Sequence, residues 1–195
     1  MKGKIFILSG PSGSGKTTLY KNLFKRQRLK RKIVKILSVT TRSKRLGEKR
    51  GKDYIFVSHK MFLYKKNAGH FLESQKLFDN YYGTPNKNIR EFLKKGKNIL
   101  LCIDVKGADV ICQRYTNVVK IFVKTVSMKI LKKRLKSRRS ENKKEIAVRL
   151  KIAKKELNEV KKYHYVVIND NLDKANEFLE SIILKELGEQ NITSK

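Results

Sequence analysis

An eight-residue segment near the N-terminus carries the strongest chemical signal in the chain. It reads Gly10-Pro11-Ser12-Gly13-Ser14-Gly15-Lys16-Thr17 and fits the P-loop pattern G-x-x-x-x-G-K-[ST]. Glycines let backbone N–H groups turn toward a phosphate, the lysine reaches the β and γ phosphates, and the Thr17 hydroxyl can ligate Mg²⁺. The segment follows an apolar run, Ile5–Ser9, and precedes a helical pattern. The sequence therefore predicts a binding site for a nucleoside triphosphate.

The elements around this loop alternate between strand and helix, which predicts an α/β fold with a parallel sheet. A polar, basic stretch separates the first β–α–β unit from several short strands, which we expect to form an antiparallel insertion. The expected strands are Ile5–Ser9, Ile33–Leu37, Tyr54–Val57, Phe71–Gln75, Asn80–Tyr82, Ile99–Asp104, Val118–Val123 and Tyr165–Asn169. The expected helices are Lys16–Arg28, Met61–Lys66, Asn86–Lys95, Val105–Tyr115, a segment from Ser127, Lys144–Lys162 and Leu172–Leu187.

Length and composition fit one folded domain without membrane spans. The chain has 195 residues, of which 39% are hydrophobic. Its longest apolar stretch, Ile99–Ile103, is far too short to cross a bilayer, and the start has no signal-peptide core. Two cysteines, Cys102 and Cys112, cannot form a disulfide framework. We expect a cytoplasmic protein with both thiols reduced.

The charge is strongly positive, with 48 Lys and Arg against 17 Asp and Glu, or +31. Residues 25–35 alone contain seven basic side chains in eleven positions. Lysine dominates over arginine, however, and lysine lacks the planar fork that reads bases and grips phosphates in two places. We therefore expect a solvated basic surface whose binding to nucleic acid is at most weak and nonspecific.

Beyond the P-loop, several separated motifs resemble the guanylate kinase family. They are Ser38 to Arg45, Gly47-Glu48, Gly51 to Tyr54, Phe71-Leu72-Glu73, Asn80 to Thr84, Ile103-Asp104, Gly107, Arg134-Leu135, Arg138, Arg149-Leu150 and Val167 to Asp170. Order and spacing agree over residues 3–187. The resemblance implies a core of residues 3–36 and 97–187, a small α+β GMP-binding insertion at 37–96, a helical lid at 136–150 and a tail at 188–195.

The resemblance implies an ATP:GMP phosphotransferase, with GMP and ATP as substrates and Mg²⁺ accompanying ATP. Arg42 and Arg45 offer two guanidinium groups, and Tyr54 and Tyr82 offer two phenolic hydroxyls, which suit the phosphate of a nucleoside monophosphate. The ionised carboxylate of Glu73 can accept hydrogen bonds from guanine N1–H and from its 2-amino group. Adenine lacks both of those donors. The implied GMP-binding residues are Ser38, Arg42, Arg45, Tyr54, Glu73, Tyr82, Thr84 and Asp104.

The same resemblance implies which residues handle ATP. Arg138 and Arg149 match lid arginines that close over the donor phosphates, and Arg139 is an alternative to Arg138. The implied ATP-binding residues are Gly10, Pro11, Ser12, Gly13, Ser14, Gly15, Lys16, Thr17, Arg134 and Asn169. The implied catalytic residues are Lys16, Arg42, Arg138 and Arg149, with Thr17 at the metal. Asn169 could instead cap the last helix.

Two positions depart from the family pattern. Cys102 and Asn171 stand where the family usually carries acids. Two other functions stay open at this point. One is a related kinase acting on a phosphorylated sugar, and the other is a noncatalytic guanylate-kinase-like protein that binds polyanions through its basic surface. The intact Lys16 and the lid arginines favour the enzyme.

Overall fold

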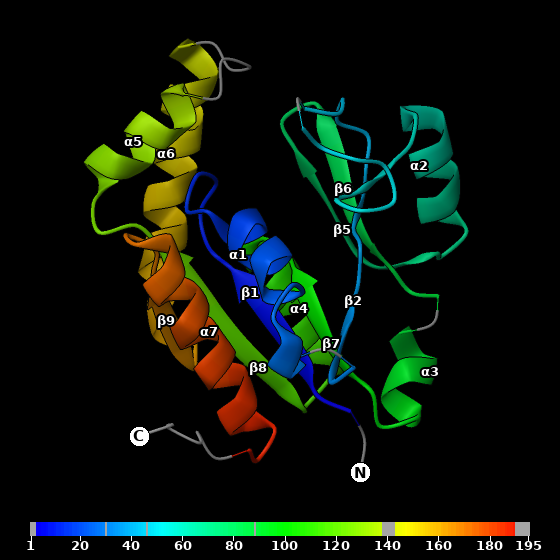
Figure 1. Ribbon diagram of the computed structural model, residues 1–195. Coiled ribbons are helices and arrows are strands. Elements are labelled where there is room, and N and C mark those ends of the chain that lie inside the picture. Colours follow the sequence, from blue (N-terminus) through cyan, green and yellow to red (C-terminus); the bar gives the residue numbers. More distant parts are fainter. Residues whose placement is uncertain (1–2, 30, 46, 88, 138–142, 190–195) are drawn as a thin grey trace. The chain divides into compact units, whose positions relative to one another are not determined.

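The structure is a computed structural model that describes residues 3–29, 31–45, 47–87, 89–137 and 143–189 (Figure 1). The chain divides into two compact units. The first comprises Met1–Ile7 and Arg31–Val118, and the second comprises Leu8–Lys30 and Val119–Lys195. Each contains parallel strands and helices, which confirms the expected α/β class.

Three parallel-sheet strands of the first unit follow the order β2-β7-β1. Strands β2 (Ile33–Lys35) and β7 (Asn98–Cys102) pair in parallel, and the N–H of Ile99 donates to the carbonyl of Lys4, just before β1 (Ile5–Ser9). The apolar residues of β1 and the run Ile99–Leu101 of β7 are buried without alternation, as expected for central parallel strands. Helix α3 (Ile89–Lys94) contacts β7, and α4 (Val105–Arg114) follows it in the chain.

A second, four-stranded sheet of this unit has the order β4-β3-β6-β5. It consists of β3 (Val39–Thr40), β4 (Ile55–Phe56), β5 (Phe71–Leu77) and β6 (Asn80–Pro85). The pair β5–β6 is antiparallel, as predicted, and β6 also pairs in antiparallel with β3, which sequence analysis did not predict, whereas β3 and β4 run parallel. The expectation of an antiparallel insertion is therefore confirmed for β5 and β6 and wrong for β4, which pairs in parallel with β3.

The two faces of this small sheet have different surroundings. Glu73 pairs with Thr84 and Gln75 with Tyr82, so their side chains share one face. Tyr81 lies on the other face, where the ring of Phe62 stacks on it with 5.3 Å between centroids. Phe62 belongs to α2 (His59–Asn67), which covers that other face (Figure 1). The polar face with Glu73 is thus separated by the sheet from an aromatic core.

The second unit contains the P-loop helix α1 (Lys16–Leu23) and a parallel pair, β8 (Val118–Lys124) and β9 (Tyr165–Ile168). It also holds α5 (Met128–Lys136), α6 (Lys143–Asn158) and α7 (Leu172–Glu186), with short 3-10 turns at Gln27–Leu29 and Glu159–Lys162. Helix α7 packs on α1 and on β9, and α5 contacts α6.

The end of one helix and the cap of another in this unit differ from the sequence-based expectation. Helix α1 ends at Leu23 rather than Arg28; after its C-cap residue Phe24 come four polar residues, and the buried Leu29 belongs to a separate 3-10 turn. Helix α7 is capped by Asn171, whose side chain accepts the N–H groups of Asp173 and Lys174 at 3.0 Å each. The alternative that Asn169 caps this helix is therefore wrong.

Arg26, within the basic run, pairs with Glu180 at 3.0 Å, so part of this run serves folding. Cys102 and Cys112 are thiols. In the ranges that the structure describes, no helix combines the length and the hydropathy needed to traverse a bilayer.

Candidate active site

The P-loop is shaped by glycines in positive-φ conformations. Gly10, Gly13 and Gly15 have φ values of 132°, 90° and 92°. A Cβ on Gly10 would lie 2.1 Å from the carbonyl oxygen of Val123, and one on Gly15 would lie 2.1 Å from Asn169 Nδ2. Any side chain at these two positions would clash with the surrounding structure. The glycines of the motif therefore meet a steric requirement as well as a conformational one.

The side chain of Lys16 folds back onto the P-loop backbone. Its Nζ donates to the carbonyl of Gly10 and to that of Pro11, the latter at 2.9 Å. Phosphate oxygens are stronger acceptors for an ammonium group than neutral carbonyls are. A triphosphate entering the loop would therefore draw Lys16 toward itself. Thr17 follows at the second position of α1 and is half-buried.

Two residues predicted to bind ATP support the loop. Asn169, which is 4% exposed, donates from Nδ2 to the carbonyl of Ser14 at 2.8 Å. The guanidinium of Arg134 donates to the carbonyl of Asn169 at 2.9 Å and to that of Ser14 at 3.4 Å. These bonds tie the loop to β9 and α5. The structure thus gives both residues a positioning contact with the P-loop backbone.

A third arginine reaches the loop from α6. Arg149 Nη1 donates to the hydroxyl of Ser12 at 3.3 Å. The guanidinium therefore lies beside the P-loop, where donor phosphates would bind. Arg138, the other predicted lid arginine, and its alternative Arg139 lie outside the described residues.

In the first unit, Arg42 is held by a carboxylate that sequence analysis did not assign. Its Nη2 donates to both oxygens of Glu48, at 2.9 and 3.0 Å, and Nη1 donates to the carbonyl of Ser43. Glu48 also accepts the backbone N–H of Arg45 at 2.9 Å. Burial opposes the charge on Glu48, but the bonds from Arg42 and Arg45 outweigh it and lower the pKa of this carboxyl. Both partners of the pair are therefore charged at neutral pH.

Aromatic rings complete the surroundings of Arg42. The guanidinium carbon lies 5.4 Å from the ring centroid of Tyr54 and 5.8 Å from that of Phe56. Tyr54 and Tyr82 meet edge to face with 6.4 Å between centroids. Burial alone would lower the pKa of Arg42, yet its bond to Glu48 and the neighbouring groups raise it. The structure brings Arg42, Tyr54 and Tyr82 together as a cationic cluster with phenol groups.

A buried carboxylate lies on the polar face of the small sheet. Glu73, 8% exposed, accepts the hydroxyl of Thr84 at 2.6 Å. Burial, with a contribution from the carboxylate of Asp104, raises the pKa of Glu73 to about 7 although the Thr84 bond acts in the opposite sense. Asp104 caps α4 by accepting the N–H of Gly107 at 2.7 Å. The carboxylates of this cluster can accept hydrogen bonds when they are ionised.

The predicted residues fall into two clusters, one in each unit. The P-loop, Arg134, Arg149 and Asn169 belong to the second unit, and the eight predicted GMP-binding residues belong to the first. Ser38 and Arg45 take part through the backbone: the carbonyl of Ser38 accepts from Ile55 at 3.0 Å, and Arg45 donates to Glu48. Glu48 belongs to the Gly47-Glu48 motif of the family resemblance, but sequence analysis gave it no role of its own; it is also the first acidic residue of a chain whose N-terminal part is otherwise basic.

Comparisons with known proteins agree with this arrangement. The family model for guanylate kinase matches residues 2–186. A guanylate kinase of Caldanaerobacter subterraneus subsp. tengcongensis is 41% identical over 186 residues, which cover 95% of this chain and 88% of the relative. One of Wolbachia sp. subsp. Brugia malayi is also 41% identical, over 95% of this chain and 94% of the relative.

A solved structure is similar as well. The crystal structure of guanylate kinase from Anaplasma phagocytophilum matches with a TM-score of 0.77 at 34% identity, covering 95% of this chain and 86% of that chain. Sequence, fold and the two clusters therefore lead to one conclusion, that the chain belongs to the guanylate kinase family.

Proposed function

We propose that this member of the guanylate kinase family transfers the γ-phosphoryl group of ATP to GMP, producing ADP and GDP, with Glu73 as the group that recognises guanine. The observation that carries the choice of acceptor is the buried Glu73 carboxylate, bonded to Thr84 and near Asp104. An ionised carboxylate accepts but cannot donate, which matches the adjacent N1–H and 2-amino donors of guanine. AMP offers no such pair of donors.

The remaining acceptor residues would hold the phosphate of GMP. Arg42 and Arg45 supply guanidinium groups, and Tyr54 and Tyr82 supply phenolic hydroxyls. Glu48 orients Arg42 through two hydrogen bonds, so the fork is fixed before the substrate arrives. Ser38 and Thr84 would complete the contacts with the nucleotide. We assign these residues to the GMP-binding insertion at residues 37–96, and Asp104 would join them from the core segment that begins at residue 97.

The donor cluster would neutralise the phosphates of ATP. The P-loop backbone surrounds them, Lys16 leaves its carbonyl partners for the β and γ oxygens, and Arg149 stands beside Ser12. We place Arg138 with Arg149 in a lid at residues 136–150, within a core of residues 3–36 and 97–187. Asn169 and Arg134 would position the loop from behind, and Asn169 would also meet the adenine edge.

No general base is required for this reaction. The attacking oxygen of GMP is already anionic, so positioning and charge neutralisation suffice. His59, His70 and His164 consequently need no chemical role.

Mg²⁺ fits the donor cluster as an ion bound mainly by the substrate. Among the described residues, no group of three or more His, Cys, Asp and Glu could hold a metal by itself. The half-buried Thr17 hydroxyl can supply one oxygen ligand, and phosphate oxygens and water would supply the others. When bound, Mg²⁺ supplies charge neutralisation at the transferring phosphoryl group.

These assignments disfavour the two other functions. A kinase for a phosphorylated sugar would not need the acceptor set of Glu73, Thr84 and Asp104. A noncatalytic polyanion-binding protein would not need Lys16 with a complete P-loop. Because its substrates are cytoplasmic metabolites, we place the protein in the cytoplasm. We expect at most weak, nonspecific binding of nucleic acid.

A coupled assay of ADP production tests the proposed function. The purified chain would be given Mg²⁺-ATP with GMP, AMP, CMP, UMP or a phosphorylated sugar. We expect turnover with GMP and negligible turnover with the others, together with GDP as the second product by chromatography. A preference for AMP or for the sugar phosphate would refute the proposed acceptor, and no turnover with any acceptor would favour a binding protein.

A further inference from the structure

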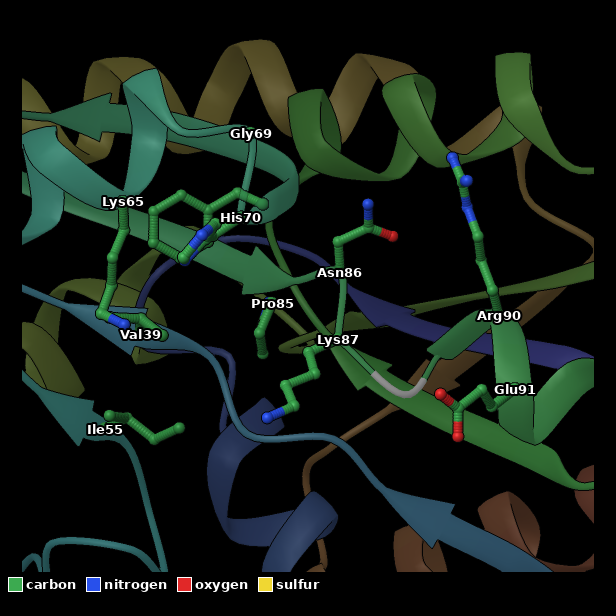
Figure 2. A pocket seen from close by; sticks show the side chains of 11 residues that line it. Val39, Ile55, Lys65, Gly69, His70, Pro85, Asn86, Lys87, Arg90 and Glu91 are labelled. Carbon is green, nitrogen blue, oxygen red and sulfur yellow. The ribbon is translucent and has the colours of Figure 1, made fainter.

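A pocket of about 570 Å³ opens on the first unit (Figure 2). This volume lies within the range of roughly 300–1,000 Å³ that is typical of small-molecule sites. None of the predicted GMP-binding residues lines it. Its lining comes from β3 and β4, the end of α2, the start of β5, the end of β6 and the start of α3.

The register of the small sheet places this pocket behind the proposed guanine site. Val39 pairs with Ile55 on one side and with Gly83 on the other, so their side-chain positions share a face. Gly83 is two residues from Tyr81, which packs on α2. Glu73 and Thr84 occupy the opposite face. The pocket and the guanine-reading carboxylate are therefore separated by the thickness of one sheet.

The pocket has an apolar floor that remains partly open to solvent. Val39 is buried, Phe71 and Pro85 are half-buried, and Ile55 is 36% exposed. Exposed isoleucine in a strand beside other apolar groups is a surface that a hydrophobic ligand can cover. This floor favours an organic molecule with an apolar body over a bare inorganic ion.

Two ammonium groups accompany that floor. Figure 2 shows the side chains of Lys65 and Lys87 extending toward the side of the pocket where Val39 and Ile55 lie, whereas the guanidinium of Arg90 extends away from them. In the described part of the chain, Lys65 Nζ and Lys87 Nζ form no hydrogen bond or ion pair. The acidic residue of the lining, Glu91, belongs to α3 with Arg90. The floor thus has unneutralised positive charge next to it.

The wall also holds an unsatisfied acceptor. Asn86 Oδ1 is buried and has no hydrogen-bond partner in the described structure, while the backbone N–H of Asn86 donates to the carbonyl of His70 at 2.8 Å. Buried polar atoms are nearly always bonded, so this atom favours a ligand that brings a donor.

We propose that this pocket binds a small organic anion: an apolar, preferably aromatic body lies on Val39, Ile55 and Pro85 while its phosphate, sulfonate or carboxylate group pairs with Lys65 and Lys87. The lining of this pocket shares no residue with either proposed substrate site. The two ammonium groups favour an anionic ligand, and the apolar floor favours an anion that also carries an apolar group. Binding here does not depend on the assignment of GMP as the acceptor.

Fluorescence of 8-anilinonaphthalene-1-sulfonate, an aromatic sulfonate, tests the proposal on the full chain. The titration is run with saturating GMP, Mg²⁺ and a nonhydrolysable ATP analogue, which occupy the substrate sites. We expect saturable binding of one probe molecule per chain. Substituting Lys65→Gln and Lys87→Gln together should weaken it by about tenfold, the sum of two exposed ion pairs.

Two further variants decide between site-specific and general binding. The double variant Lys94→Gln and Lys95→Gln removes the same charge from exposed positions at the end of α3 and should leave the titration unchanged. Ile55→Thr keeps a β-branched residue in β4 but reduces the apolar floor, and should weaken the probe as well. Equal weakening by both lysine pairs, or loss of the signal when substrates are added, would overturn the proposal.

Discussion

Gly107 and Glu73 are packed so closely that a Cβ on Gly107 would lie 2.9 Å from Glu73 Oε2. The same Cβ would lie 3.3 Å from Asp104 Oδ1, the oxygen that caps α4. A residue without a side chain therefore lets the helix N-terminus approach the carboxylate that we propose reads guanine. The relationship explains why glycine stands in the first turn of α4, where alanine would favour the helix more.

Gly107→Ala should separate stability from substrate recognition. Alanine favours a helix over glycine by about 1 kcal/mol, which offsets the cost of the close contact. The added methyl group displaces the Glu73 carboxylate, so we expect KM for GMP to rise by about tenfold, as for one lost charge-assisted bond. Thermal unfolding and steady-state kinetics measure the two effects. An unchanged KM would show that the position of the carboxylate does not matter.

The pH dependence of GMP use should follow Glu73. Its pKa of about 7 means that the carboxyl is largely protonated at pH 6 and largely ionised at pH 8. Because only the ionised form accepts both guanine donors, kcat/KM for GMP should rise with pH up to about 7 and level off above it.

The phosphate of GMP also titrates, near pH 6, so the wild-type profile needs a control. Glu73→Gln removes the carboxyl but leaves the phosphate unchanged. Dividing kcat/KM of the wild type by kcat/KM of Glu73→Gln at each pH isolates the effect of Glu73. This ratio should increase with pH between about 6 and 8. A constant ratio would contradict the assignment.

Glu48→Gln tests whether the Arg42 guanidinium must be oriented by hydrogen bonds before GMP binds. Loss of the charge on Glu48 weakens both bonds to Arg42, so we expect KM for GMP to rise about fivefold or more, with a smaller change in kcat. Lys49→Gln, at an exposed neighbouring position, is the control. If Glu48→Gln instead binds GMP more tightly, Glu48 competes with the phosphate for Arg42.

Lys16→Met tests the donor cluster alone. Methionine keeps much of the apolar stem but removes the cation that we propose moves to the donor phosphates, so kcat should fall by about a hundredfold or more. Binding of GMP, measured by calorimetry without ATP, should stay within about twofold. Lys25→Met, at an exposed position beyond α1, should behave as wild type. Near wild-type kcat in Lys16→Met would contradict the role of the P-loop.

Much of the fold could be predicted because long apolar runs bury their side chains in the sheet. Strand β1 coincides with its prediction, and β8 differs only by the addition of Lys124. Strand β3 could not be predicted from periodicity, since it consists of Val39 and Thr40 alone and exists through its pairing with β4 and β6. Tertiary pairing, not local pattern, decides such a short strand.

In the candidate site, too, local sequence patterns predict some features and tertiary contacts decide the others. The P-loop could be located from its glycines and lysine, because their spacing reflects local backbone geometry. The pairing of Glu48 with Arg42, the contact of Gly107 with Glu73 and the use of Asn169 to hold the loop depend on which chain segments meet in space. Residue types indicate what each side chain can bond to, but folding decides its partner.

The most direct test of the central claim is a cycle that combines Glu73→Gln with a changed base. IMP has the N1–H and the 6-oxo group of guanine but lacks the 2-amino group, so it removes one of the two donors that Glu73 is proposed to accept. The kcat/KM values of wild type and Glu73→Gln would be measured with GMP and with IMP at pH 8, where the Glu73 carboxyl is ionised.

If Glu73 accepts the 2-amino group, wild type should prefer GMP over IMP, and Glu73→Gln should lose about ten- to a hundredfold with GMP but clearly less with IMP. The unequal losses define a coupling between the carboxylate and the 2-amino group. Equal losses with the two substrates, or no loss with GMP, would contradict the claim that Glu73 recognises guanine.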